Sequence, residues 1–324
     1  MIPLQSILMS SLSLGEARAV ALLLLERVCG FSQTDVLMGK ADSLPCGQQL
    51  LLQEMAQRVA NGEPVQYVVS VEDFCGLTLH VEPGVLIPRP ETEELVNRTV
   101  ERMKAGPRGD ILDIGTGSGC IALALKHRMA DVRVEAWDVS RDALRIAAEN
   151  ARLLNLDIDF RCRDVLMEEV REVKEVIDSD TAQQEGRYAL IISNPPYVCR
   201  AEAADMEPNV LAHEPHLALF VPDDDPLLFY RSIASFARRH LVDDGRLHFE
   251  INRRFGHEIV SLLQSLGFDE VELQNDQFEQ PRYIFATWKT GGPTPSPSLV
   301  GRGVGRQEGK KTRRLSDAGS VIAQ

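Results

Sequence analysis

The 324-residue chain has few of the features that mark disulfide-stabilised, zinc-binding or membrane-spanning proteins. Its six cysteines are scattered and contain no CxxC pair, which predicts reduced thiols and neither a disulfide framework nor a zinc site. The most apolar stretch, residues 19–25, has charged flanks and is too short to span a bilayer. The chain also lacks the basic start of a secretory signal peptide. We therefore expect a cytoplasmic protein that does not engage a membrane.

A surplus of basic residues is missing as well. The chain has 35 Lys and Arg against 48 Asp and Glu, which gives a formal net charge of -13. Because contacts to nucleic-acid phosphates depend on Lys and Arg, this balance argues against a broad nucleic-acid-binding surface. The apolar and charged fractions, 44% and 26%, are those of an ordinary globular protein with one large or two modest domains.

The N-terminal part of the chain, residues 1–64, predicts a small helical bundle. Ser13 followed by Glu16 is the signature of a capping box at a helix start. A further helix is expected over residues 48–60, where apolar side chains recur at helical spacing before an Asn-Gly stop. Residues 65–90 then favour short extended segments, and we expect them to form a hairpin linker.

The main domain, residues 91–290, alternates strand and helix patterns. Strands are expected over residues 110–114, 133–137, 159–161, 189–192, 246–251, 270–274 and 282–288. Helical patterns lie between the first five, notably over 120–129 and 141–154. Strict alternation predicts an α/β fold with a doubly wound, mostly parallel seven-stranded sheet, and the last two strands are close enough for an antiparallel hairpin.

Two segments do not fit this domain. Residues 168–187 are polar and acidic, and we expect a surface insertion there. From residue 291 to 324 the composition shifts to Gly, Pro, Ser and basic residues, which cannot bury a core and predict a disordered basic tail.

A glycine-rich loop joins the first strand of the main domain to its helix. The loop consists of Gly115, Thr116, Gly117, Ser118 and Gly119. Glycines at alternate positions let the backbone bend sharply and approach a ligand closely. The NAD fingerprint needs its third glycine one position later, where this chain has Cys120, and no Gly-Lys-Ser/Thr follows as in a P-loop. The loop therefore favours S-adenosylmethionine over a dinucleotide.

Two acidic residues follow the next two strands. Asp138 ends the second strand, nineteen positions after Gly119, where a carboxylate can accept hydrogen bonds from both ribose hydroxyls. Asp164 follows the third strand at a position suited to an adenine amino group, and Val165 can pack on the ring. Each acid alone is also typical of a helix cap or a solvated loop. Together with the glycine loop, they predict a nucleoside site at the carboxyl edge of the sheet.

A third signal follows the strand over residues 189–192. The tetrapeptide there is Asn194-Pro195-Pro196-Tyr197. It offers an amide side chain, the carbonyl of a proline that has no N–H, and an aromatic ring. Two acceptors and a ring suit a planar group that bears an NH2. The alternative is a strand that ends in a Pro-Pro turn beside an unrelated Asn.

With these motifs in this order, the chain resembles the HemK-like release-factor glutamine methyltransferases. The resemblance runs from the helical bundle to about Trp288, and includes residues 88–92, 214–219 and 225–227. It implies the class I methyltransferase fold and S-adenosylmethionine as the methyl donor. It also implies that the acceptor is the glutamine side-chain nitrogen of the Gly-Gly-Gln motif in class I peptide chain release factors. The tetrapeptide alone also occurs in methyltransferases that act on amino groups of nucleic-acid bases.

The resemblance assigns roles to individual residues. Asn194 Oδ1 and the Pro195 carbonyl are expected to hold the two amide hydrogens, while Tyr197 sandwiches the amide plane and Pro196 completes the substrate contact. Asn194 is expected to contact the cofactor as well. Phe74, in the hairpin, is expected to help close the site. A catalytic metal is not needed, and a monomer that binds release factors without direct nucleic-acid contact is expected.

The sequence departs from the family at residues 67–70, where Tyr-Val-Val-Ser stands in place of a Tyr-Ile-Leu-Gly-like stretch. Two alternatives stay open at this point. The first is a methyltransferase acting on an exocyclic amino group of an RNA or DNA base, which would need a flipped base and a basic approach surface. The second is a non-catalytic domain that binds the cofactor or assists ribosome-associated factors.

Overall fold

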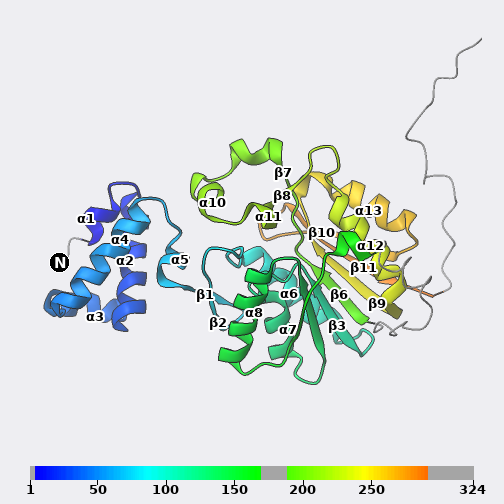
Figure 1. Ribbon diagram of the computed structural model, residues 1–324, viewed down its shortest axis with the longest axis horizontal. Coiled ribbons are helices and arrows are strands. Elements are labelled where there is room, and N and C mark those ends of the chain that lie inside the picture. Colours follow the sequence, from blue (N-terminus) through cyan, green and yellow to red (C-terminus); the bar gives the residue numbers. More distant parts are fainter. Residues whose placement is uncertain (1–3, 169–187, 291–324) are drawn as a thin grey trace, which may run out of the picture.

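The structure is a computed structural model, and it describes residues 4–168 and 188–290. The predicted insertion over 168–187 lies outside these ranges except for its first residue. The predicted tail over 291–324 lies outside them as well. Figure 1 shows a helical bundle at the N-terminal end and a larger domain built around one sheet. Among the described residues, no helix is both long and apolar enough to cross a membrane.

The N-terminal bundle consists of short helices around a core of its own. They are α1 (Leu4–Leu8), α2 (Leu14–Cys29), α3 (Gln33–Leu37), the 3-10 helix η1 (Lys40–Ser43) and α4 (Cys46–Ala60). The capping box predicted at Ser13 is present, since its hydroxyl accepts from the Glu16 N–H and the Glu16 carboxylate accepts from the Ser13 N–H. Leu24 and Leu52 are fully buried where α2 and α4 meet. The predicted bundle is therefore confirmed.

The linker is only partly as predicted. The hairpin is present as β1 (Val71–Phe74) paired with β2 (Leu77–His80). The expectation of extended chain from residue 65 is wrong, because α5 (Val65–Val69) is a helix. Its three valines favour a strand locally, but Tyr67 is 2% exposed and its hydroxyl donates to the Val85 carbonyl at 2.5 Å. This buried contact outweighs the weak local preference.

The main sheet has seven strands in the order β10-β11-β9-β6-β3-β4-β5. The strands are β3 (Asp110–Ile114), β4 (Val134–Asp138), β5 (Asp159–Cys162), β6 (Tyr188–Ser193), β9 (Leu241–Glu250), β10 (Asp269–Asn275) and β11 (Pro281–Trp288). The pairs from β9 to β5 are parallel, whereas β11 is antiparallel to both β9 and β10. The predicted fold class is confirmed. β9 begins five residues before the predicted strand, because its first residue, Leu241, pairs with Tyr188 of β6 ahead of a register shift.

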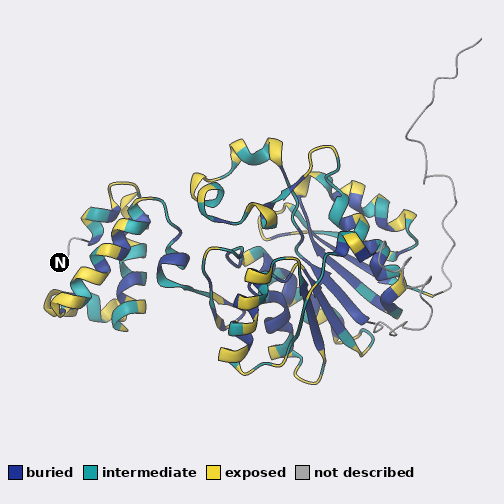
Figure 2. Ribbon diagram, viewed as in Figure 1, coloured by how far each residue is buried: buried dark blue, intermediate teal, exposed yellow. Residues whose placement is uncertain are grey.

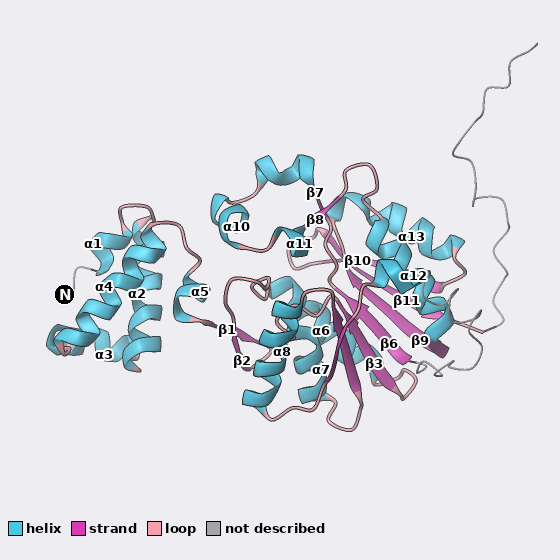
Figure 3. Ribbon diagram, in the orientation of Figure 1, coloured by secondary structure: helices cyan, strands magenta, loops and turns pink. Residues whose placement is uncertain are grey.

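Helices cover both faces of this sheet (Figures 1 and 3). They are α6 (Pro90–Met103), α7 (Cys120–Arg128), α8 (Arg141–Leu154), α12 (Leu228–His240) and α13 (Gly256–Ser265). Along β6, Leu190 and Ile192 pack in the core with α6 and α7, whereas Ile191 packs with α12 and α13. Side chains alternate between the faces of a strand, so β6 is buried on both sides, as Figure 2 shows for the central strands.

Short elements complete the chain beyond the carboxyl edge of the sheet. They are η2 (Val165–Met167), β7 (Val198–Cys199), η3 (Arg200–Asp205), α10 (Pro208–His213), α11 (His216–Leu219), β8 (Phe220–Val221) and η4 (Arg253–Phe255). β7 and β8 pair with each other in a separate two-stranded sheet.

The glycine loop between β3 and α7 yields a prediction about stability. Gly115 and Gly119 both have positive φ, +77° and +83°. A Cβ at Gly115 would meet open space, whereas one at Gly119 would lie 3.1 Å from Ala147 Cβ and from Leu123 Cδ1. Both alanine variants carry the left-handed backbone cost of about 1–2 kcal/mol, and Gly119→Ala adds overpacking of about 1–3 kcal/mol. Urea unfolding of ligand-free protein should show the larger loss for Gly119→Ala. Equal losses would contradict this account of the packing.

Candidate active site

A cavity of about 230 Å³ lies at the carboxyl ends of β3, β4 and β6. This volume is many times the roughly 30 Å³ that a water molecule occupies in the liquid, so the cavity admits an organic ligand. The predicted site residues that line it are Gly115, Gly117, Asp138, Asp164, Val165, Asn194, Pro195 and Pro196. Three separate predicted motifs therefore meet in one place, as expected for the edge of a parallel sheet.

Three residues of the predicted cofactor loop are not at the cavity wall. Thr116 is buried and donates its hydroxyl to Asp113 Oδ2 at 2.6 Å. Ser118 is buried, and its carbonyl accepts from Asn150 Nδ2 at 3.0 Å. Gly119 packs against α8. These residues hold the loop in shape, while Gly115 and Gly117 leave open space where a side chain would stand.

Asp138 holds the same loop from the next strand. Its Oδ2 accepts from the Gly117 N–H at 2.9 Å, and its Oδ1 accepts from the Ser140 N–H at 2.8 Å. Burial raises the pKa of Asp138, and these backbone hydrogen bonds oppose the rise. Each carboxylate oxygen has a second lone pair, so Asp138 retains acceptor capacity on the cavity side. Sequence reasoning predicted its contact with a ligand and missed its contact with the glycine loop.

Asp164 and Val165 form the next part of the wall. Asp164 caps η2, since its Oδ1 accepts from the Leu166 N–H at 2.9 Å. Val165 is buried to 7% exposure with its neighbours from α12, and it also borders the cavity. An apolar side chain beside a carboxylate suits a flat heteroaromatic ring that bears an amino group.

Asn194 is positioned by contacts on both sides. The preceding residue, Ser193, donates its hydroxyl to the Ile114 carbonyl at 2.6 Å, which ties the end of β6 to the end of β3. Asn194 Nδ2 donates to Thr92 Oγ1 at 3.1 Å. No described residue donates a hydrogen bond to Asn194 Oδ1 or to the Pro195 carbonyl. The two acceptors predicted for an NH2 group are therefore both available.

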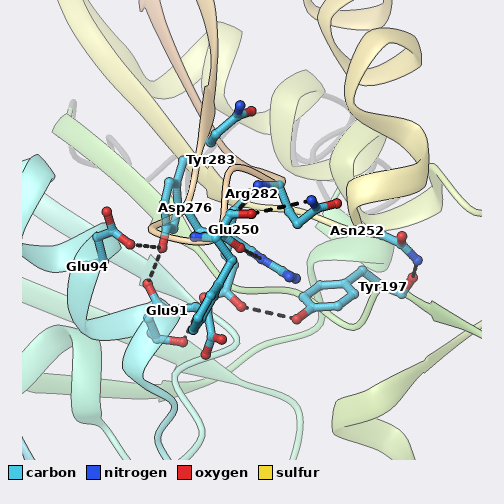
Figure 4. Close-up of polar contacts among 12 residues, drawn as sticks. Glu91, Glu94, Tyr197, Glu250, Asn252, Asp276, Arg282 and Tyr283 are labelled. Atoms are coloured by element: carbon cyan, nitrogen blue, oxygen red, sulfur yellow. Dashed lines mark hydrogen bonds and ion pairs between the residues drawn. The ribbon is translucent and has the colours of Figure 1, made fainter. Parts of the chain in front are cut away.

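Tyr197 lies beside the cavity and does not line it. Its hydroxyl donates to Glu250 Oε1 at 3.1 Å, and its carbonyl accepts from Asn252 Nδ2 at 3.0 Å, as Figure 4 shows for the hydroxyl. Burial and the adjacent Glu250 raise the pKa of Tyr197, which keeps the phenol protonated at neutral pH. Hydrogen bonds thus hold both the hydroxyl of the ring and the backbone of Tyr197.

Phe74 is not brought to the cavity. Its side chain is 2% exposed and lies in the core formed by the hairpin, α6 and α7. Hydrophobic residues in a hairpin are as suited to a core as to a substrate contact, and only the packing distinguishes the two.

Sequence reasoning missed Thr92 and Glu250. Thr92 lies in the first turn of α6 and donates its hydroxyl to Glu250 Oε2 at 2.7 Å, at the end of β9. Burial raises the pKa of Glu250, while Thr92, the charge of Arg282 and the Tyr197 hydroxyl oppose the rise. The rule that selected Asp138, an acid at the carboxyl end of a strand, would also have selected Glu250.

The walls opposite the sheet were missed as well. Residues 84–86 contribute to the cavity, as do Pro215, Leu217 and Ala218. They are linked by Glu214, whose side chain is 1% exposed, accepts from the Ile87 N–H at 3.2 Å and pairs with Arg89. In the sequence, residues 214–219 indicate only the family resemblance. No group of three or more His, Cys, Asp or Glu side chains could hold a metal within residues 4–168 and 188–290.

Asp113, beneath the glycine loop, yields a prediction about pH. Burial raises its pKa from 3.8 to about 7, against the opposing hydrogen bond from Thr116. The unfolded carboxyl ionises near pH 4, so between about pH 4 and 7 the folded state holds one more proton, and stability falls as pH rises. Asn at this position does not titrate. From pH 4 to 7, the free energy of unfolding of the native protein should therefore fall relative to Asp113→Asn by up to roughly 4 kcal/mol. Parallel pH profiles in urea unfolding would contradict it.

Comparison with known proteins adds to this geometry. Residues 7–69 match the PrmC N-terminal domain, and residues 92–213 match the Methyltransferase small domain. A release factor glutamine methyltransferase of Bacteroides thetaiotaomicron is 41% identical over 84% of this chain and 92% of its own. Proteins with the same name from Flavobacterium psychrophilum and Streptococcus pneumoniae are each 39% identical, over 81% and 73% of this chain and 88% and 79% of their own. The chain belongs to the release factor glutamine methyltransferase family.

Proposed function

We propose that the protein transfers a methyl group from S-adenosylmethionine to the side-chain amide nitrogen of the glutamine in the Gly-Gly-Gln motif of class I peptide chain release factors. The observation that carries this proposal is the pair of available acceptors, Asn194 Oδ1 and the Pro195 carbonyl, at a cavity suited to a nucleoside. Family membership supports the choice of substrate.

The residues around the cavity fit the methyl donor. Gly115 and Gly117 leave room for it to approach the backbone, and Asp138 offers acceptors to ribose hydroxyls. Asp164 and Val165 suit the adenine ring and its amino group. When bound, S-adenosylmethionine supplies an electrophilic methyl group on a positively charged sulfur.

The acceptor end of the site handles a poor nucleophile. An amide nitrogen shares its lone pair with the carbonyl, which lowers its reactivity. Asn194 Oδ1 and the Pro195 carbonyl accept the two amide hydrogens, so they aim the nitrogen and stabilise the positive charge that develops on it. Such orientation can contribute about 7–11 kcal/mol in well-aligned systems. The proton leaves to water after transfer. The Tyr197 ring lies beside the cavity, with its hydroxyl bonded to Glu250 and its backbone carbonyl to Asn252.

The proposal also covers the compartment, the oligomeric state and the partner of the protein. The protein acts in the cytoplasm as a monomer, with the release factor as its protein partner. The net charge of -13 supports recognition of a protein over broad contact with nucleic acid.

A direct assay tests the substrate. The purified protein is offered labelled S-adenosylmethionine with a class I release factor, tRNA, rRNA and DNA in parallel reactions. We expect label on the release factor only, at the Gly-Gly-Gln glutamine, and none on a release factor in which that glutamine is replaced by Glu. Label on a nucleic acid with an unlabelled release factor would instead establish the base-amino alternative.

The role of Asn194 yields a second test. Asn194→Ala removes one of the two acceptors for the amide hydrogens, so kcat should fall by about 10²–10³-fold, as for the loss of one donor from an oxyanion hole. Calorimetry should still detect S-adenosylmethionine binding. Turnover equal to that of the native protein would remove Asn194 from the mechanism.

The role of Asp138 yields a third test. Asp138→Ala loses the ribose acceptors and both backbone hydrogen bonds that hold the glycine loop. Because hydrogen bonds to a charged group contribute about 1.5–3 kcal/mol each, the Kd for S-adenosylhomocysteine should rise at least about tenfold. Asp142→Ala, at an exposed position in the first turn of α8, is the matched control and should leave the Kd unchanged. An unchanged Kd in Asp138→Ala would exclude the assignment.

A further inference from the structure

Three residues from distant parts of the chain form a buried series of hydrogen bonds behind the substrate position. Asn194 Nδ2 donates to Thr92 Oγ1 at 3.1 Å, and Thr92 Oγ1 donates to Glu250 Oε2 at 2.7 Å. Thr92 is 3% exposed and Glu250 is 2% exposed, so water does not compete for these groups. In such surroundings each hydrogen bond is strengthened and each unpaired group is costly.

The polarity of this series is set at one end. An ionised carboxylate can only accept hydrogen bonds, so the Thr92 hydroxyl must give its single proton to Glu250. The lone pairs of the hydroxyl then remain for Asn194, and only the NH2 end of the carboxamide can donate to them. Asn194 Oδ1 is thereby turned away from Thr92, towards the side where the substrate amide is proposed to bind.

The other oxygen of Glu250 is also committed. Glu250 Oε1 accepts from the Tyr197 hydroxyl at 3.1 Å (Figure 4). Burial raises the pKa of Glu250, whereas its hydrogen bonds from Thr92 and Tyr197 and the positive charge of Arg282 favour the ionised carboxylate. Two hydroxyls therefore donate to one carboxylate, and both oxygens of Glu250 act as acceptors. Glu250 thus contacts the Tyr197 hydroxyl directly and the Asn194 carboxamide through Thr92.

We propose that Glu250 and Thr92 are positioning residues, which fix the carboxamide of Asn194 with its oxygen towards the substrate. The proposal rests on the proposed function for its kinetic consequence. Without this series, the Asn194 carboxamide can turn by 180° and present NH2 to the substrate NH2. Two donors would then face each other and the amide would not be held.

A pair of matched variants in α6 tests the proposal. Thr92→Val removes the hydroxyl with little change of shape, and kcat for release-factor methylation should fall at least tenfold while the KM for S-adenosylmethionine stays within about twofold. Thr99→Val is the control, since Thr99 is also buried in α6 and its hydroxyl bonds to His248 Nδ1, at 3.0 Å, instead of to Asn194 or Glu250. Its kcat should stay at the native level. Thr92→Ser, which keeps the hydroxyl, should recover most of the loss. A native kcat in Thr92→Val, or equal losses in both valine variants, would overturn the proposal.

A double-mutant cycle tests whether Thr92 and Glu250 act through one series of hydrogen bonds or independently. Glu250→Leu frees the Thr92 hydroxyl to donate to Asn194 Oδ1, so it should lower kcat as Thr92→Val does. The double variant Thr92→Val/Glu250→Leu should then be no slower than Glu250→Leu alone, because Thr92→Val removes a constraint that Glu250→Leu has already removed. Losses that multiply would mean that the two residues act separately, which the proposal excludes.

A spectroscopic measurement keeps the proposal separate from the identity of the substrate. In 15N-labelled protein with S-adenosylhomocysteine, the side-chain amide resonances of Asn194 are assigned by their loss in Asn194→Ala. They should shift in Thr92→Val and Glu250→Leu, and stay in place in Thr99→Val. If release factors were not methylated by the native protein, the proposed function would fail. The shifts of the Asn194 resonances would still support the positioning role of Thr92 and Glu250. Unshifted resonances would refute the positioning role of Thr92 and Glu250, whatever the substrate.

Discussion

The parallel pairing of β3 with β6 is the constraint on which the site depends. It places the glycine loop, which follows β3, beside Asn194, which follows β6, although the two are far apart in the chain. The Ser193 hydroxyl donates to the Ile114 carbonyl at 2.6 Å, which joins the last residue of β6 to the last residue of β3. A one-residue slip would turn every side chain of β6 to the opposite face, so the two buried faces hold the register.

Around this pair, the structure assigns support and contact to different residues. Within the glycine loop, Gly115 and Gly117 line the cavity, while the side chains of Thr116 and Ser118 are buried. Asn194 lines the cavity, while Thr92, which does not line it, contacts both Asn194 and Glu250. A nucleophile as weak as an amide nitrogen gains reactivity mainly from orientation, so the supporting residues matter as much as those that touch the substrate.

The interior charges follow the same logic. Asp113 and Glu250 are buried and Asp138 is half-buried, at the carboxyl ends of β3, β9 and β4, and desolvation raises the pKa of each. Asp138 and Glu250 have two hydrogen-bond donors each, and these offset part of the cost of burial. The site thus concentrates acceptors where the proposed ligands present hydroxyl, amino and amide hydrogens.

The sequence by itself determined those features that depend on a few neighbouring residues. The capping box at Ser13, the alternation of strands and helices, and the glycine loop, whose Gly115, Gly117 and Gly119 all have positive φ, were predicted correctly. Only the tertiary structure decided that residues 65–69 form a helix, that Phe74 is buried in the core, and that Thr92 contacts both Asn194 and Glu250. The reason is physical: Thr92 lies 102 positions from Asn194 and 158 from Glu250, so their contact depends on how the sheet and α6 pack, which no local preference encodes.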